Sequence, residues 1–228
     1  MHYDFKMKLN KVDSQQYKNF LIPEIDWLLN EAQEIFVKIV AEPRKRSYLG
    51  FEKTQRTIDD IRTIVITDKI VPIEKSIALL PTDYWHFLKA NVRMTKGGCK
   101  NINARLKLRQ HDDEFENSPF DNSSFEWRTV NGVFNKDGIK FYTDGTFTNT
   151  DVELSYIKKL KYIHNAKDFR SGKYKLPSGI LLDKFCNCEL PNQTHREIVD
   201  LAVLIVTGQI YIPDYQIKLN KLNLNDLK

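Results

Sequence analysis

The sequence lacks several features that would place it in a class at once. No hydrophobic run reaches the roughly 18 apolar residues that a membrane-spanning helix needs. The first residues, MHYDFKMKLNKVDS, contain no apolar segment of the kind found in signal peptides, so we expect no secretion signal. Only three cysteines occur among 228 residues, which argues against a disulfide framework and predicts reduced thiols in an intracellular setting.

Motifs that identify common enzymes are also missing. The sequence contains no phosphate loop, dinucleotide-binding fingerprint, nucleophile elbow or HExxH zinc motif. An acidic cluster at residues 111–116 lacks the alternating spacing and the glycine of a calcium-binding loop. We therefore interpret this cluster as a solvated or interfacial patch, and we expect the protein not to be an enzyme.

A metal site is the one cofactor that the residues suggest. Cys186 and Cys188 lie close to His195 in the sequence, and His164 precedes them. The two cysteines are separated by one residue, whereas common zinc sites separate them by two to four and usually add a second pair. We therefore expect structural thiols, no metal ion and no cofactor.

Composition describes an ordinary folded protein. Hydrophobic residues make up 41% of the chain and charged residues 29%, a balance that differs from that of disordered proteins. The formal net charge of +5 permits contact with nucleic acid or an acidic partner but does not require it. The length allows one large domain or two small ones.

Three segments show the apolar period of an amphipathic helix. The first begins at Pro23 and is stopped by Pro43, and a second covers Phe51–Val65. The third lies near the end of the chain, where Asn192 or Thr194 can cap the helix, Glu197 has the capping-box spacing from Thr194, and Gly208 can supply a C-cap. Each of these helices must bury its apolar stripe, and we expect them to do so against one another.

The middle of the chain has the two-residue alternation of β-strands, separated by turns that contain glycine. We therefore predict an α+β fold, a helical bundle formed by the N- and C-terminal helices with an inserted antiparallel β region. The predicted division is residues 1–65 for the N-terminal helices, 66–185 for the β region and 186–228 for the C-terminal helix and tail.

A basic segment interleaved with aromatic residues covers the end of the last predicted strand, Val152–Ile163, and the loop after it. Its cations include Lys158, Lys159, Lys161, Arg170, Lys173 and Lys175, and its aromatic residues include Tyr156, Tyr162, Phe169 and Tyr174. Basic and aromatic residues together can bind nucleic acid, which would make the protein a nucleic-acid-binding protein acting through residues 156–175. The same lysines can instead protect a solvated strand edge from aggregation, or form a docking surface for an acidic partner.

Four segments, in order, carry a resemblance to a known family. They are PEIDWLLNEAQEIFVKIV, FEKTQRTIDDIRTIV, LPTDYWHFLKANVRM and ELPNQTHREIVDLAVLIV. This order resembles the head-to-tail adaptor (connector) proteins in the neck of tailed phages, including the tail tubular type of short-tailed phages and the ring proteins of crAss-like phages. The large β-rich middle departs from the smaller, mostly helical adaptors.

The resemblance implies a structural protein of the virion, assembled in the host cytoplasm and located in the neck or tail. It implies a homo-oligomeric ring, usually of twelve copies, stacked beneath the portal protein and next to another neck or tail protein. DNA would pass through the lumen of this ring during ejection. The family implies no catalysis and no cofactor, and we expect no membrane partner.

The last residues of the chain form a separate element. Pro213 prevents simple continuation of the preceding helix, and the segment after it is too short for a stable helix alone in water. Its apolar residues are Tyr215, Ile217, Leu219, Leu222 and Leu224. We predict that they dock on a partner, and the resemblance favours the portal; the alternative is a short helix folded back on the bundle.

Overall fold

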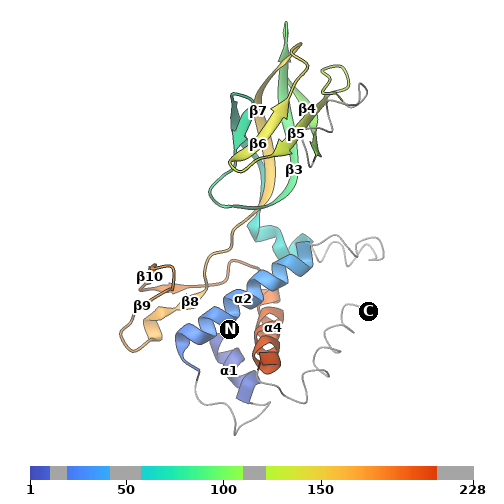
Figure 1. Cartoon of the computed structure of the whole chain (residues 1–228). Helices are drawn as coiled ribbons and strands as arrows, with labels where there is room; N and C mark the ends of the chain where they lie inside the picture. Colours follow the sequence, from blue (N-terminus) through green and yellow to red (C-terminus); the bar gives the residue numbers. More distant parts are fainter. Residues whose placement is uncertain (11–19, 42–57, 110–121, 210–228) are drawn as a thin grey trace, which may run out of the picture. The chain divides into compact units, whose positions relative to one another are not determined.

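The computed structural model describes residues 1–10, 20–41, 58–109 and 122–209 (Figure 1). The chain divides into two compact units. One unit, here called the helical unit, consists of Met1–Thr63 together with Leu160–Lys228, and the other, the barrel unit, consists of Ile64–Lys159. Residues 160–185, which the sequence analysis assigned to the β region, therefore belong to the helical unit.

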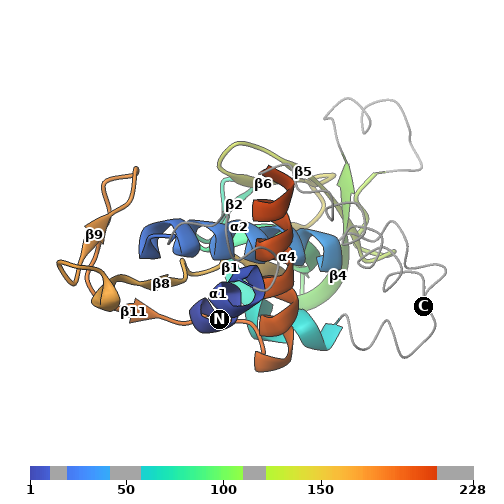
Figure 2. The same ribbon diagram turned by 90° about the horizontal axis from the view of Figure 1, so that it is seen from below.

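Three helices form the core of the helical unit. They are α1 (His2–Asn10), α2 (Ile22–Ala41) and α4 (His195–Gln209), and α4 lies across α2 in Figures 1 and 2. Ile25 and Leu29 of α2 and Ile198 of α4 are fully buried, because the apolar stripes of the two helices face each other. Phe5 of α1 is equally buried, so α1 also contributes to this core.

The predicted second helix is only partly visible. Residues 51–57 lie outside the described part of the chain, and residues 58–61 are helical. A single 3₁₀ turn, η2 (Arg62–Ile64), follows, and the first strand begins at Val65.

Short elements complete the helical unit. Strand β8 (His164–Asn165) pairs with β11 (Phe185–Cys186), and β9 (Tyr174–Lys175) pairs with β10 (Leu181–Leu182). The 3₁₀ turns η4 (Ala166–Asp168) and η5 (Asn192–Thr194) precede β9 and α4. Among the described residues, no helix is both long enough and apolar enough to cross a membrane.

The barrel unit is a closed sheet of seven strands. They are β1 (Val65–Glu74), β2 (Ile77–Leu79), β3 (Tyr84–Lys96), β4 (Cys99–Arg109), β5 (Thr129–Phe134), β6 (Gly138–Tyr142) and β7 (Thr148–Lys158). Neighbouring strands follow the order β1-β2-β6-β5-β4-β3-β7, and β7 pairs with β1 to close the barrel. All pairs are antiparallel except β4 and β5, which run parallel.

The predicted fold class is therefore wrong. The protein is not a helical bundle with an inserted antiparallel β region, because its dominant element is the closed barrel, and strand accounts for about 40% of the structure against 32% for helix. Alternation along the sequence shows that a strand has two different faces but not which strands are neighbours. It therefore could reveal neither the closure between β1 and β7 nor the parallel pair.

Inward-facing side chains fill the barrel. Val92, Met94 and Tyr156 are fully buried there, and the Tyr156 hydroxyl donates to Asp83 Oδ1 at 2.8 Å. The wall is tightest where β2 meets β6, because a Cβ added at Gly138 would lie 2.1 Å from the carbonyl oxygen of Ala78. Glycine at this position therefore permits the close approach of the two backbones.

Candidate functional site

The strongest candidate site is an open groove of about 430 Å³ on the helical unit. Its walls are mostly apolar and rich in aromatic rings. The lining residues are Phe20, Pro23, Glu24, Trp27, Leu28, Tyr162, Tyr174, Lys175, Leu176, Pro177 and Val206. They come from the start of α2, from the last turns of α4 and from the segment around β9, so separate parts of the sequence build the groove.

The start of α2 places Trp27 in this groove. The Leu21 N–H donates to Glu24 Oε2 at 2.8 Å, a side-chain bond that satisfies one amide before the helix begins. The buried stripe of α2 then passes through Ile25, Leu28 and Leu29. Trp27 lies outside this stripe and keeps 52% of its side chain exposed, which leaves a large apolar surface available to a partner.

Asp26 fixes the wall of the groove that Tyr174 forms. This carboxylate is fully buried, and its Oδ2 accepts hydrogen bonds from the Tyr174 hydroxyl at 2.5 Å and from the Asn165 N–H at 3.1 Å. His2 Nε2 lies 2.5 Å from Oδ1. One buried carboxylate therefore joins α1, α2, β8 and β9, as a buried charge requires partners.

The chemistry of Tyr174 follows from this contact. Burial raises the pKa of the Tyr174 phenol, and the hydrogen bond to the nearby Asp26 carboxylate raises it further. Burial and the charge of Asp26 also raise the pKa of Tyr162. Both phenols thus stay protonated at neutral pH, and the tether to Asp26 holds the Tyr174 ring in position as a rigid wall of the groove.

Two polar side chains of α2, those of Asn30 and Gln33, form hydrogen bonds that hold Ile163 and Cys188 against this helix. Asn30 Nδ2 donates to the carbonyl oxygen of Ile163 at 2.7 Å, and Asn30 Oδ1 accepts from the Ile163 N–H at 2.8 Å. Gln33 Oε1 accepts a hydrogen bond from the Cys188 thiol at 3.1 Å. Burial raises the pKa of Cys188 to about 11, so this thiol is a protonated donor and is not a thiolate at neutral pH.

The residues considered for a metal site do not form one in the described part of the chain. No group of three or more His, Cys, Asp and Glu side chains there could hold a metal ion. Cys188 bonds to Gln33, and His195 Nε2 lies 3.0 Å from the carbonyl oxygen of Leu190. The acidic cluster at residues 111–116 lies outside the described residues, so the expected absence of metal and cofactor stays a prediction.

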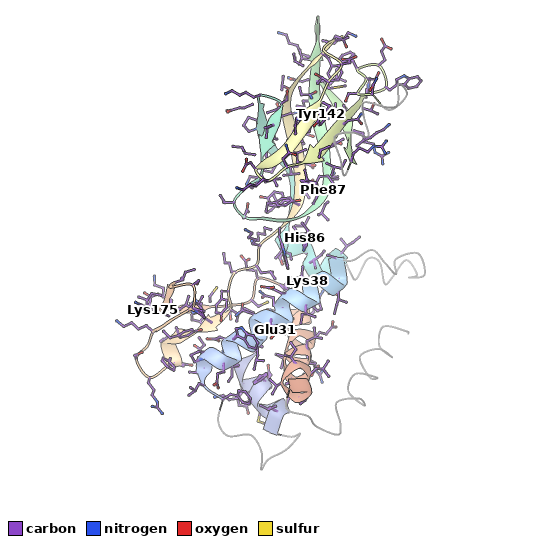
Figure 3. The ribbon with its side chains drawn as sticks, viewed as in Figure 1. Glu31, Lys38, His86, Phe87, Tyr142 and Lys175 are labelled. Atoms are coloured by element: carbon purple, nitrogen blue, oxygen red, sulfur yellow. The ribbon has the colours of Figure 1, made fainter. Side chains whose placement is uncertain are left out.

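The predicted basic segment is divided between the two units. Lys158 and Lys159 end the barrel unit, whereas Lys161, Arg170, Lys173 and Lys175 belong to the helical unit. Lys161 pairs with Glu189 Oε1 at 3.0 Å, and Lys175 of β9, labelled in Figure 3, lines the groove. Two of the aromatic residues, Tyr162 and Tyr174, also line the groove, so part of this segment is a wall of the apolar site.

The predicted docking residues of the tail cannot be placed. Tyr215, Ile217, Leu219, Leu222 and Leu224 all lie outside the described residues. Their role as a partner-binding element, like the nucleic-acid or partner contact of the basic segment, stays a prediction.

Sequence reasoning missed the groove and the role of Asp26. The sequence does indicate that Trp27 is exposed, because this tryptophan lies off the apolar stripe of its helix. It does not indicate that Asp26 pairs with Tyr174, since 148 positions separate the two residues. No known protein family and no curated protein matches this chain.

Proposed function

We propose that this protein is a subunit of the head-to-tail connector (adaptor) ring in the neck of a tailed phage. In this proposal it forms a homo-oligomeric ring, of twelve copies as in the family it resembles, beneath the portal protein and against an adjacent neck or tail protein. DNA passes through the lumen. The protein resides in the virion and has no catalytic role.

The observation that carries the proposal is the aromatic groove of the helical unit. A half-exposed Trp27 and a tethered Tyr174 form a rigid apolar surface, and such aromatic anchors are typical centres of protein–protein interfaces. Because the hydrogen bond to Asp26 fixes the Tyr174 ring before binding, this ring loses little conformational entropy when a partner occupies the groove. The groove therefore suits an apolar protein segment from a neighbouring subunit or from the portal.

The polar groups of the groove support binding and not catalysis. Glu24 accepts a hydrogen bond from the backbone N–H of Leu21, just before its helix, and the Tyr174 hydroxyl is held by Asp26. Lys175 is the remaining charged group among the described lining residues. A nucleophile paired with a general base, which hydrolysis would need, is not found among these residues.

The segments that carry the family resemblance also have structural roles. In LPTDYWHFLKANVRM, Asp83 accepts the hydrogen bond of the buried Tyr156, and the Tyr84 ring packs 5.7 Å from the Tyr156 ring. In ELPNQTHREIVDLAVLIV, the Thr194 hydroxyl donates to the carbonyl oxygen of Pro191 at 2.8 Å and organises the entry into α4. Such residues maintain a fold, which agrees with a structural protein.

The proposal is tested by assembly with the portal protein that a phage carrying this chain would encode. Native mass spectrometry of the wild-type mixture should show a defined multimer of this chain bound to the portal. Trp27→Ala should weaken that association by about 30-fold or more, the loss expected for a central aromatic anchor. The matched control is Ile39→Ala, because Ile39 is 54% exposed on the same helix but does not line the groove.

Two results would contradict the proposal. Purely monomeric behaviour of the wild-type protein with every neck component present would exclude the adaptor function. Equal loss of assembly in Trp27→Ala and Ile39→Ala would show that the groove is not the contact site. Circular dichroism of each variant distinguishes a lost contact from a lost fold, since both side chains are half exposed.

A further inference from the structure

A short turn of the barrel unit presents the most exposed of the large hydrophobic side chains recorded for the described residues. Trp127 is 82% exposed, at the tip of the turn between Ser124 and Thr129. The backbones of Ser124 and Thr129 exchange two hydrogen bonds of 2.9 and 3.0 Å, and the Trp127 N–H donates to Ser124 Oγ at 3.3 Å. The turn is therefore closed and well ordered by its own bonds, and it holds a large indole in water, where an apolar ring is costly unless a partner covers it.

Arg128, the next residue, adopts a strained backbone conformation in this turn. Arg128 has a φ of 49°, a left-handed conformation that side chains other than glycine rarely adopt. Its carbonyl oxygen accepts a hydrogen bond of 2.8 Å from the Arg105 N–H, which ties the turn to β4. Strained residues of this kind often mark functional positions, because the surrounding structure must compensate for them.

Three cations lie on the strand and the turn beside the exposed indole. Ala104 and Leu106 of β4 point into the barrel core, so the alternation directs Arg105 and Lys107 to the outer face. Strand β5 begins at Thr129, which is paired in register with Arg105 beside β4 in Figure 1. Among the described residues, no carboxylate forms an ion pair with Arg105, Lys107 or Arg128.

The indole and one of these cations also share a hollow. Lys107, Asn122, Ser124, Trp127 and Thr129 line a space of about 440 Å³ on the outside of the barrel. It combines a flat aromatic face, a positive charge, an amide and two hydroxyl groups. The only carboxylate within the turn itself is Glu126, so the cations outnumber the anions among the described residues of β4 and this turn that form the surface.

We infer that this surface, defined by Trp127, Arg105, Lys107 and Arg128, binds single-stranded nucleic acid. The indole stacks on an unpaired base, and the three cations neutralise neighbouring phosphates. The amide and hydroxyl groups of the hollow donate and accept hydrogen bonds at the base edge or the sugar. A duplex would fit poorly, because its bases are stacked on one another and offer no free face to the indole.

This inference is independent of the proposed ring and of the basic segment at residues 156–175. It rests on residues of β4 and of the following turn, which the sequence analysis did not select. The ring could exist without this surface, and the surface could act in a protein that forms no ring.

Fluorescence anisotropy of the full chain with a labelled oligothymidine of about 16 nucleotides, the upper site size of a single-strand-binding fold, tests the inference. The affinity should fall about 20-fold between 50 and 200 mM salt, because three neutralised phosphates give a log–log slope near −2 for single strands. Trp127→Ala should weaken binding by about 5- to 150-fold, the range for one base stacked on an aromatic side chain. Trp127→Phe should restore most of the loss.

Charge variants identify the cations. Arg105→Ala should lower the magnitude of the salt slope by about 0.7, the contribution of one phosphate contact. Lys136→Ala is the control, because Lys136 is an equally exposed cation in the turn between β5 and β6 and is not part of this surface. It should leave both affinity and slope unchanged, and thermal unfolding should confirm that all variants fold.

The inference would be overturned by any of three results. The first is no change in anisotropy with the wild-type protein at low salt. The second is equal affinity of wild type and Trp127→Ala, which would show that binding is a diffuse charge effect. The third is a duplex of the same length that binds as tightly as the single strand.

Discussion

Asn30→Ala tests the two side-chain hydrogen bonds that hold the backbone of Ile163 against α2. The Asn30 side chain is 8% exposed and bonds both the N–H and the carbonyl group of Ile163. Alanine removes both partners and leaves these two backbone groups buried and unsatisfied. Each such group costs about 1–3 kcal/mol, so we expect the free energy of unfolding to fall by about 2–6 kcal/mol.

Circular dichroism at 222 nm is a suitable assay, because the described α-helices with complete bounds all belong to the helical unit. A loss of 3 kcal/mol should lower the melting temperature of that unit by about 6–12 °C, at the usual 2–4 °C per kcal/mol for a chain of this size. Asn30→Asp should destabilise at least as much, because it places an oxygen opposite the carbonyl oxygen of Ile163 in place of the amide donor.

Asn187→Ala is the matched control, since Asn187 is exposed in the same unit and its side chain has no bond recorded in the described structure. Its effect should stay within about 0.5 kcal/mol. If Asn30→Ala melts within about 2 °C of the wild type, the two bonds to Ile163 contribute no net stability, and the reasoning is wrong.

Two further predictions concern the buried carboxylate and the barrel wall. Tyr174→Phe should cost about 1.5–3 kcal/mol in urea unfolding, because Asp26 loses a donor. The folded-state pKa of Tyr174 is raised above its ordinary 10.0, so the unfolded chain loses this proton first as the pH rises. The difference in unfolding free energy between wild type and Tyr174→Phe should therefore shrink above pH 10. Tyr3→Phe, at a 73% exposed site, is the control and should show neither effect. Gly138→Ala should open or unfold the barrel, because the added Cβ would lie 2.1 Å from a carbonyl oxygen of β2. Gly98→Ala is the control, because its added Cβ meets no atom within 4 Å. A normal melting curve of Gly138→Ala would refute the tight approach of the two backbones.

Helices were the part of the fold that the sequence predicted best. The helix expected from Pro23 is α2, Ile22–Ala41, and the helix expected after Thr194 is α4, His195–Gln209. The apolar stripe of each helix lies within one short segment, so local information is enough to place it, whereas the expected C-cap residue Gly208 lies inside α4. The expected helix Phe51–Val65 shows the limit, because its last residue is already the first of β1.

The barrel and the groove are formed by contacts between residues far apart in the sequence. Alternation of apolar residues and composition do not predict which of these residues pair. Val65 pairs with Ile157 across the closure of the barrel, and Arg105 pairs with Thr129 in the parallel step. Similarly, Tyr174 was selected as an aromatic residue in a basic segment, but its position depends on Asp26. The sequence identified the residue types, whereas their partners required the three-dimensional structure.

The interrupted helical unit has a consequence for how the protein is made. Ribosomes synthesise α1 and α2 first, but α4, which covers them, follows only after the whole barrel unit. At translation rates of about 5–20 residues per second, the roughly 150 residues between Ala41 and His195 delay this cover by about 8–30 s. During that interval Ile25 and Leu29, which are fully buried in the finished protein, lack α4 as a packing partner. The nascent chain therefore presents an apolar helix face while the barrel is already free to fold, which makes the early helices a natural substrate for chaperones.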